Sequence, residues 1–110
     1  MLRRVILVVI VLGFLSPFAY AENPIVAVSR SKAKADLKAS LMETYGSSYS
    51  TIEMLLNAGM EDYDKLCEIP SSSVNDKILK ELFDTYYPSF STICMLFKAN
   101  KESFNKLQSN

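Results

Sequence analysis

The sequence contains no histidine and no tryptophan, and only three glycines and two cysteines among its 110 residues. Without histidine, the chain cannot build a Ser-His or Cys-His nucleophile pair, a histidine-bearing metal site or an imidazole acid/base. An excess of one charge is also lacking, because 12 basic residues balance 12 acidic ones. Such a chain is one domain at most, and its neutrality argues against a basic nucleic-acid binder. We therefore predict no enzyme and no catalytic, metal-binding or cofactor-binding residues.

Much of the apolar excess lies in the first 21 residues. Two arginines precede an apolar stretch over 5–15, and a proline and two small residues follow it. This order is typical of a cleaved signal peptide over 1–21, with the cut between Ala21 and Glu22, and the stretch is short for a membrane span. We expect export from a bacterial cell to the periplasm or beyond, with membrane contact only before cleavage.

Removal of this leader leaves 89 residues with a net charge of −2, because two arginines leave with it. Export also changes the meaning of the two cysteines, since disulfides persist in oxidising compartments. Cys67 and Cys94 are therefore either partners in one disulfide or two buried free thiols, and the sequence leaves both alternatives open.

The exported part of the chain contains an internal repeat. Residues 41–68 and 82–109 align without a gap at an offset of 41, and thirteen of the 28 aligned positions are identical. We interpret this as a tandem duplication of one supersecondary unit. Copy one covers 31–69 and copy two 73–110, after a flexible or extended N-terminal arm over 22–30.

Apolar residues recur at helical spacing in each copy, and no stretch alternates for long enough to make a strand. Gly59 and Asn100 occupy the same position of the repeat and are the residue types that best tolerate positive φ, so each is predicted to end a helix. The second and third helices of the two copies are predicted over 48–58 and 61–67, and over 89–99 and 102–108. The fold class is all-α, with about six helices in two copies of a three-helix unit of period 41, arranged as a compact pseudo-twofold bundle.

Aromatic residues gather around the predicted corner between the first and second helices of each copy. Most of them should lie in the core, but a buried tyrosine needs a partner for its hydroxyl, so some should reach the surface. These side chains are the candidate surface for a ligand or protein partner. They are Tyr45, Tyr49, Tyr86, Tyr87 and Phe90.

The segment from Ile52 to Leu66 has an apolar-Gly-apolar step at Gly59. It resembles a helix-hairpin-helix element, a family in which the hairpin amides commonly bind a DNA phosphate. The resemblance implies a hairpin near Gly59 and, as an alternative function, a periplasmic nucleic-acid-binding protein. The negative charge of the exported chain opposes nucleic acid, because such binding depends on cationic side chains.

The function that the sequence favours is a small exported helical protein that acts as a binding or structural module, without catalysis. Its partner would be a protein or peptide in the cell envelope. Two helical copies that share a core make either a compact monomer or one half of a homodimer.

Overall fold

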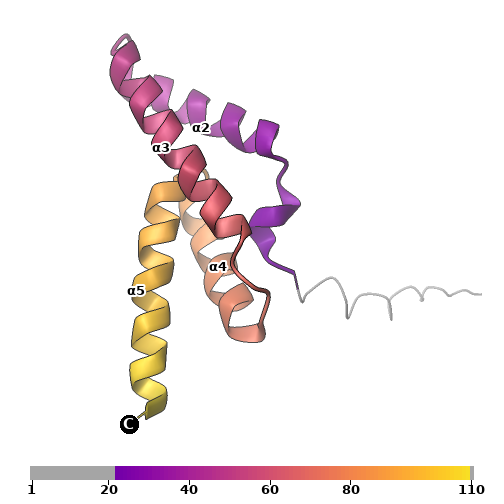
Figure 1. Ribbon diagram of the computed structural model, residues 1–110. Helices are drawn as coiled ribbons and strands as arrows, with labels where there is room; N and C mark the ends of the chain where they lie inside the picture. The colour runs from indigo at the N-terminus through magenta and orange to yellow at the C-terminus, as the bar shows by residue number, and fades with distance from the viewer. Residues whose placement is uncertain (1–21, 110) are drawn as a thin grey trace, which may run out of the picture.

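The chain folds into two helical hairpins joined by a short linker (Figure 1). The computed structural model describes residues 22–109, and the signal peptide expected over 1–21 lies outside them. A short 3-10 helix, η1 (Pro24–Ala27), precedes the first hairpin. The α-helices are α2 (Arg30–Tyr45), α3 (Tyr49–Cys67), α4 (Ser73–Tyr86) and α5 (Phe90–Ser109). The all-α prediction is confirmed for the described part of the chain, and the fold is compact, but it has four α-helices and the prediction of about six is wrong.

The prediction placed helix ends at Gly59 and Asn100, but both residues lie inside continuous helices, α3 and α5. Gly59 is buried where α3 meets α2, and a Cβ atom there would stand 2.5 Å from Cδ2 of Leu37. A glycine at this position serves close helix packing rather than a turn. Asn100 has a negative φ, and its helix propensity is only modestly unfavourable, so the helix passes through it.

The real helix ends have local causes. The Ser29 hydroxyl accepts a hydrogen bond from the Lys32 amide at 3.2 Å and caps the start of α2. Ser72 does the same for α4, with the Asn75 amide at 3.0 Å. Gly46, with φ of 61°, ends α2, because this left-handed region costs an ordinary residue more than glycine.

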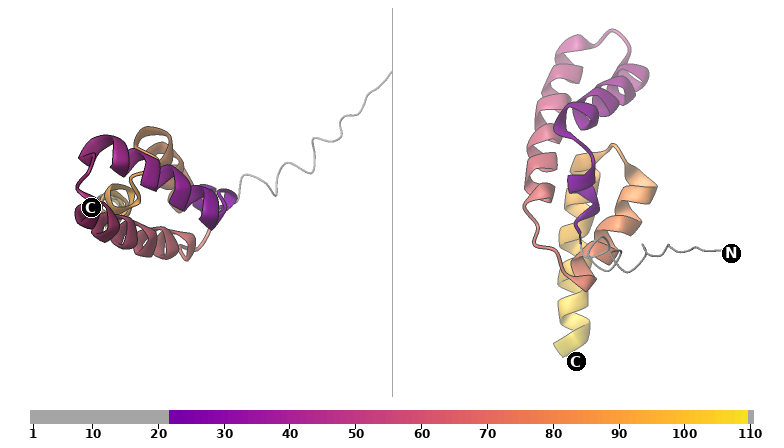
Figure 2. Two further views of the ribbon diagram at one scale, coloured as in Figure 1. Left: turned by 90° about the horizontal axis from the view of Figure 1, so that it is seen from above. Right: turned by 90° about the vertical axis from the view of Figure 1, so that its right-hand side faces the viewer.

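Helix η1 packs against both hairpins, beside α3 and α4 (Figure 2). The Asn23 side chain is buried and donates hydrogen bonds to the carbonyls of Leu66, at 2.7 Å, and Ile69, at 3.3 Å. Ile25, in the middle of η1, has no exposed surface. Within the segment over 22–30, which the sequence suggested as a flexible or extended arm, these two side chains contact the core, and five of the other residues are exposed.

The hydrophobic core lies where the hairpins meet. Helix α3 of the first hairpin contacts α5 of the second, and α4 closes the other side of α5. Each helix contributes its apolar face, as the 3.6-residue period requires. The core residues are Ile25, Ala33, Leu37, Met60, Tyr63, Leu66, Leu79, Leu82, Phe90, Ile93, Cys94 and Phe97. The outer end of the first hairpin and the C-terminal half of α5 extend beyond this junction (Figure 1).

Candidate functional site

The turn between α2 and α3 carries three exposed apolar side chains at the outer end of the first hairpin. We call this turn, residues 46–48, with its flanking Met42, Tyr45 and Tyr49, the first corner. Met42 is 42 % exposed, Tyr45 41 % and Tyr49 66 %. The ribbon shows this corner far from α4 and α5, so nothing in the described part of the chain covers it (Figure 1). Exposed aromatic rings at one end of a small domain are typical of a surface that binds another macromolecule.

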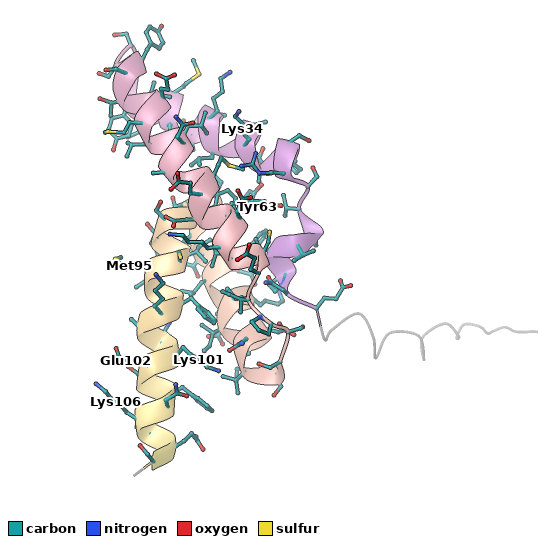
Figure 3. The ribbon with its side chains drawn as sticks, viewed as in Figure 1. Lys34, Tyr63, Met95, Lys101, Glu102 and Lys106 are labelled. Atoms are coloured by element: carbon teal, nitrogen blue, oxygen red, sulfur yellow. The ribbon has the colours of Figure 1, made fainter. Side chains whose placement is uncertain are left out.

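The equivalent turn between α4 and α5 lies at the junction of the hairpins, with Tyr87 and Pro88 half-buried and Phe90 beside them buried. We call residues 87–89, with their flanking Phe83, Tyr86 and Phe90, the second corner. Phe90 has no exposed surface and lies edge-on to Tyr63 of α3, with ring centroids 5.1 Å apart, and to Tyr87, at 5.6 Å. Figure 3 shows Tyr63 on the side of α3 that faces the start of α2. Among the large apolar side chains of this corner, only Tyr86 is well exposed, at 39 %.

The five aromatic residues predicted as one partner surface are therefore divided between two places. Tyr45 and Tyr49 lie on the free end of the first hairpin, whereas Tyr87 and Phe90 pack at the junction of the hairpins. Burial of Phe90 removes it from any partner surface. The separation arises because the second corner packs on the first hairpin, while no other helix within residues 22–109 packs on the first corner.

An electrostatic contact holds the second corner against α2. The Tyr87 hydroxyl donates a hydrogen bond to Oδ2 of Asp36, and Nζ of Lys32 lies 2.9 Å from the same oxygen. The hydrogen bond from Tyr87 and then the one from Lys32 lower the pKa of Asp36 below its ordinary value. Burial and the bond to the carboxylate raise the pKa of Tyr87. Tyr87 of the second hairpin and Asp36 of the first are thus joined by a hydrogen bond that links the two hairpins.

Acid should weaken this link. A carboxylate whose pKa is lowered in the folded state stabilises the protein above its unfolded pKa, about 3.9, and this stabilisation is lost as the pH falls through the folded value. Asp36→Asn should therefore flatten the loss of thermal stability between about pH 5 and pH 2. The control is Glu43→Gln, an exposed carboxylate outside the described ion pairs, which should follow the wild type. Equal acid profiles for Asp36→Asn and the wild type would contradict a stabilising role.

The two cysteines are free thiols in the structure and face different neighbours. Cys67 lies beside Tyr63, one turn away on α3, and Cys94 of α5 faces Asp62. Burial raises the pKa of both thiols, which disfavours the reactive thiolate. The Tyr63 hydroxyl donates to the Val28 carbonyl at 2.5 Å, and burial raises the pKa of Tyr63 to about 12. Both cysteines are free thiols in this structure, and the alternatives of a disulfide and two free thiols stay open to measurement.

An open cavity of about 790 Å³ lies between the N-terminal segment and α4. Asp76 in its wall is only 8 % exposed, and its Oδ2 accepts a hydrogen bond from the Ser71 hydroxyl at 2.7 Å. Its Oδ1 atom is buried and has no partner within residues 22–109. Sequence reasoning did not identify this cavity, because it depends on where η1 packs. Its lining residues are Glu22, Asn23, Pro24, Ala27, Ser73, Asp76, Lys77, Lys80, Glu81 and Asp84.

The structure corrects the helix-hairpin-helix expectation. The segment from Ile52 to Leu66 lies inside α3, whose backbone continues as a helix through Gly59. The predicted hairpin is wrong, and the amides that would have bound a phosphate are hydrogen-bonded within the helix instead. The apolar-Gly-apolar step is explained by the contact of α3 with Leu37.

Within residues 22–109, no cluster of three or more acidic, cysteine or histidine side chains could hold a metal ion. No helix of this part of the chain is long and apolar enough to cross a membrane. The chain matches no protein-family model, and no curated protein or solved structure is significantly similar to it.

Proposed function

We propose that the protein is an exported, non-catalytic interaction module that binds its partner through the first corner. The exposure of Tyr49 carries this proposal, because 66 % of a large aromatic side chain faces solvent at the free end of a well-packed hairpin. Tyr45 and Met42 extend the same surface along α2. Tyrosine rings supply contact area at a low cost in conformational entropy, and they are enriched among residues that dominate binding energies.

The absence of catalysis is part of the proposal. The sequence has no histidine, and the tyrosines with the clearest pKa shifts, Tyr63 and Tyr87, each hold two parts of the fold together. The lowered pKa of Asp64 has an equally structural cause, since Arg30 pairs with it across two helices at 3.0 Å. These perturbed groups stabilise contacts, and none of them faces the exposed corner.

We further propose that the two hairpins are duplicated copies of one unit. Helix α2 ends at Tyr45 and α4 at Tyr86, while α3 begins at Tyr49 and α5 at Phe90, so both boundaries recur at the offset of 41 found in the sequence. A helical hairpin of this size cannot bury its apolar face alone, and packing of a second copy against it provides the missing cover. The duplication would explain why one corner is buried and the other free.

Export by a cleaved signal remains part of the same proposal. A cut between Ala21 and Glu22 would leave Asn23 in the exported chain, and Asn23 is the residue that anchors the N-terminal segment to α3. Mass measurement of the protein from the envelope fraction, under non-reducing conditions, tests the position of the cut and the state of Cys67 and Cys94 together. A mass that includes 1–21 would contradict cleavage.

The binding role can be tested by retention of a partner from the envelope fraction on the immobilised protein. Tyr49→Ser should reduce retention at least about tenfold, which corresponds to about 1.4 kcal/mol of binding free energy. Met95→Ser is the matched control, because Met95 is 62 % exposed but lies on the outer face of α5 (Figure 3). Equal retention by both variants, or no retained protein, would contradict the proposal. Salt-sensitive retention on DNA, unaffected by Tyr49→Ser, would favour the nucleic-acid alternative.

A further inference from the structure

The two most exposed large apolar side chains in the described part of the chain have buried counterparts in the repeat. Leu107, near the end of α5, is 72 % exposed, while Leu66 at the same position of the first copy has no exposed surface. Tyr49 is 66 % exposed, while its counterpart Phe90 is completely buried. The buried members of both pairs belong to the core where the hairpins meet. The exposed members lie at opposite ends of the molecule, one on the first corner and one near the C-terminus (Figure 1).

The junction inside the molecule shows how such ends can fit together. There, Phe90 of the second corner packs edge-on against Tyr63 in the C-terminal half of α3. The counterparts of these rings are Tyr49 on the first corner and Phe104 in the C-terminal half of α5. Phe104 is half-buried, and Nζ of Lys101 lies 5.8 Å from the centroid of its ring. An aromatic pair like the internal one can therefore form between the first corner of one molecule and α5 of another.

The charges at the two ends are complementary. The first corner and its flanks, residues 42–54, carry Glu43 and Glu53 and no basic residue. The C-terminal half of α5, residues 98–107, carries three lysines and one glutamate. The described ion pairs include none of these charges. Lys101 donates a hydrogen bond to Asn75 at 2.8 Å, which leaves Lys98 and Lys106 to attract the glutamates of a second molecule.

One ion pair between molecules can be specified from the internal junction. Cys94, one turn after Phe90 on α5, faces Asp62, which is paired with Lys65 on α3. The counterpart of Cys94 is Glu53. The counterparts of Asp62 and Lys65 are Ser103 and Lys106. Because Ser103 stands where the first copy has Asp62, Lys106 has no acidic partner at that position. Glu53 of a second molecule, docked as Cys94 is docked internally, would lie next to Lys106. Lys106 lies on the outer face of α5, accessible to such a contact (Figure 3).

We propose that the partner of the first corner is a second copy of this chain, and that the corner docks on the C-terminal half of α5 and repeats the internal junction between molecules. This inference rests on the proposed function and names its partner. The contact is head-to-tail, so each molecule in a pair keeps one free end and further copies can add. The link between Tyr87 and Asp36 has no equivalent, because their counterparts are Gly46 and Lys77. The association is therefore weaker than the internal junction and depends on concentration.

Sedimentation velocity of the exported protein over a concentration series tests this docking. The wild type should form dimers and larger species as its concentration rises. Tyr49→Ser and Leu107→Ser each remove one end and should weaken self-association at least about tenfold. Mixing these two variants should restore a dimer and nothing larger, because each supplies the intact end that the other lacks. Met95→Ser should behave as the wild type, and unchanged thermal unfolding of all three variants shows that their folds are intact.

The charge pair gives a second readout. Glu53→Lys and Lys106→Glu should each weaken association, and the double variant should recover it. A wild type that stays monomeric at every concentration, or a variant mixture that stays monomeric, would overturn the docking. Loss of association in Tyr49→Ser but not in Leu107→Ser would also overturn the head-to-tail docking. That result would indicate a symmetric dimer in which two first corners contact each other. If a different protein is retained through Tyr49 while the chain stays monomeric, the proposed function stands and the second copy is excluded.

Discussion

Phe90→Ala is expected to lower the free energy of unfolding by about 3–5 kcal/mol, the usual cost of truncating a buried phenylalanine. Phe90 has no exposed surface, and its ring contacts both Tyr63 and Tyr87. A cavity at this place would separate the two hairpins at their main aromatic contact. Because small domains are stable by only about 5–15 kcal/mol, the variant should be partly unfolded at physiological temperature.

The matched control is Tyr49→Ala at the same position of the repeat. Its side chain is 66 % exposed, so its removal should change stability by no more than about 0.5 kcal/mol. Urea unfolding followed by circular dichroism measures both variants under the same conditions. Similar losses for the two substitutions would show that the corners are equally buried and would contradict the arrangement of the hairpins.

Gly59→Leu is expected to destabilise the protein by about 1–3 kcal/mol, the usual cost of overpacking a filled core. A Cβ atom at this position already stands 2.5 Å from Leu37, and leucine adds three further carbons. The gain in helix propensity over glycine, about 1 kcal/mol, offsets only part of this strain. Asn100→Leu is the control, since Asn100 is exposed within α5 and should tolerate the change.

The identity of the crowded neighbour can be checked by a double-mutant cycle. Leu37→Ala alone should cost about 2–5 kcal/mol, because Leu37 is only 6 % exposed. Combined with Gly59→Leu, it should cost less than the sum of the two by at least about 1 kcal/mol, since each change makes room for the other. Additive costs, or a Gly59→Leu variant as stable as the wild type, would rule out the close contact between α2 and α3.

Helical periodicity was sufficient to predict an all-α fold and the position of both corners. It was not sufficient at Gly59, because a glycine that permits positive φ and a glycine that permits close packing look the same in a sequence. The two possibilities differ only in where α2 lies, and Leu37 reaches Gly59 from 22 residues away in the chain. The extra helix ends were predicted for this reason.

The candidate surface was predicted in part. Tyr49 and Phe90 occupy the same position of two similar copies, so no local pattern distinguishes the exposed ring from the buried one. What separates them is whether another hairpin is seated on the corner, which is a property of the assembled fold. Asn23 gave no signal either, because a single polar residue outside the periodic segments does not reveal that its amide will meet the carbonyls of Leu66 and Ile69.

Site-specific photo-crosslinking in the native cell envelope tests the role of the first corner most directly. A benzoylphenylalanine replaces Tyr49 in one variant and Met95, an equally accessible position on α5, in the other. We expect position 49 to give a discrete adduct, of twice the mass of the chain if the partner is a second copy, and position 95 to give little. No adduct from position 49, or equal adducts from both positions, would contradict a binding role for this corner.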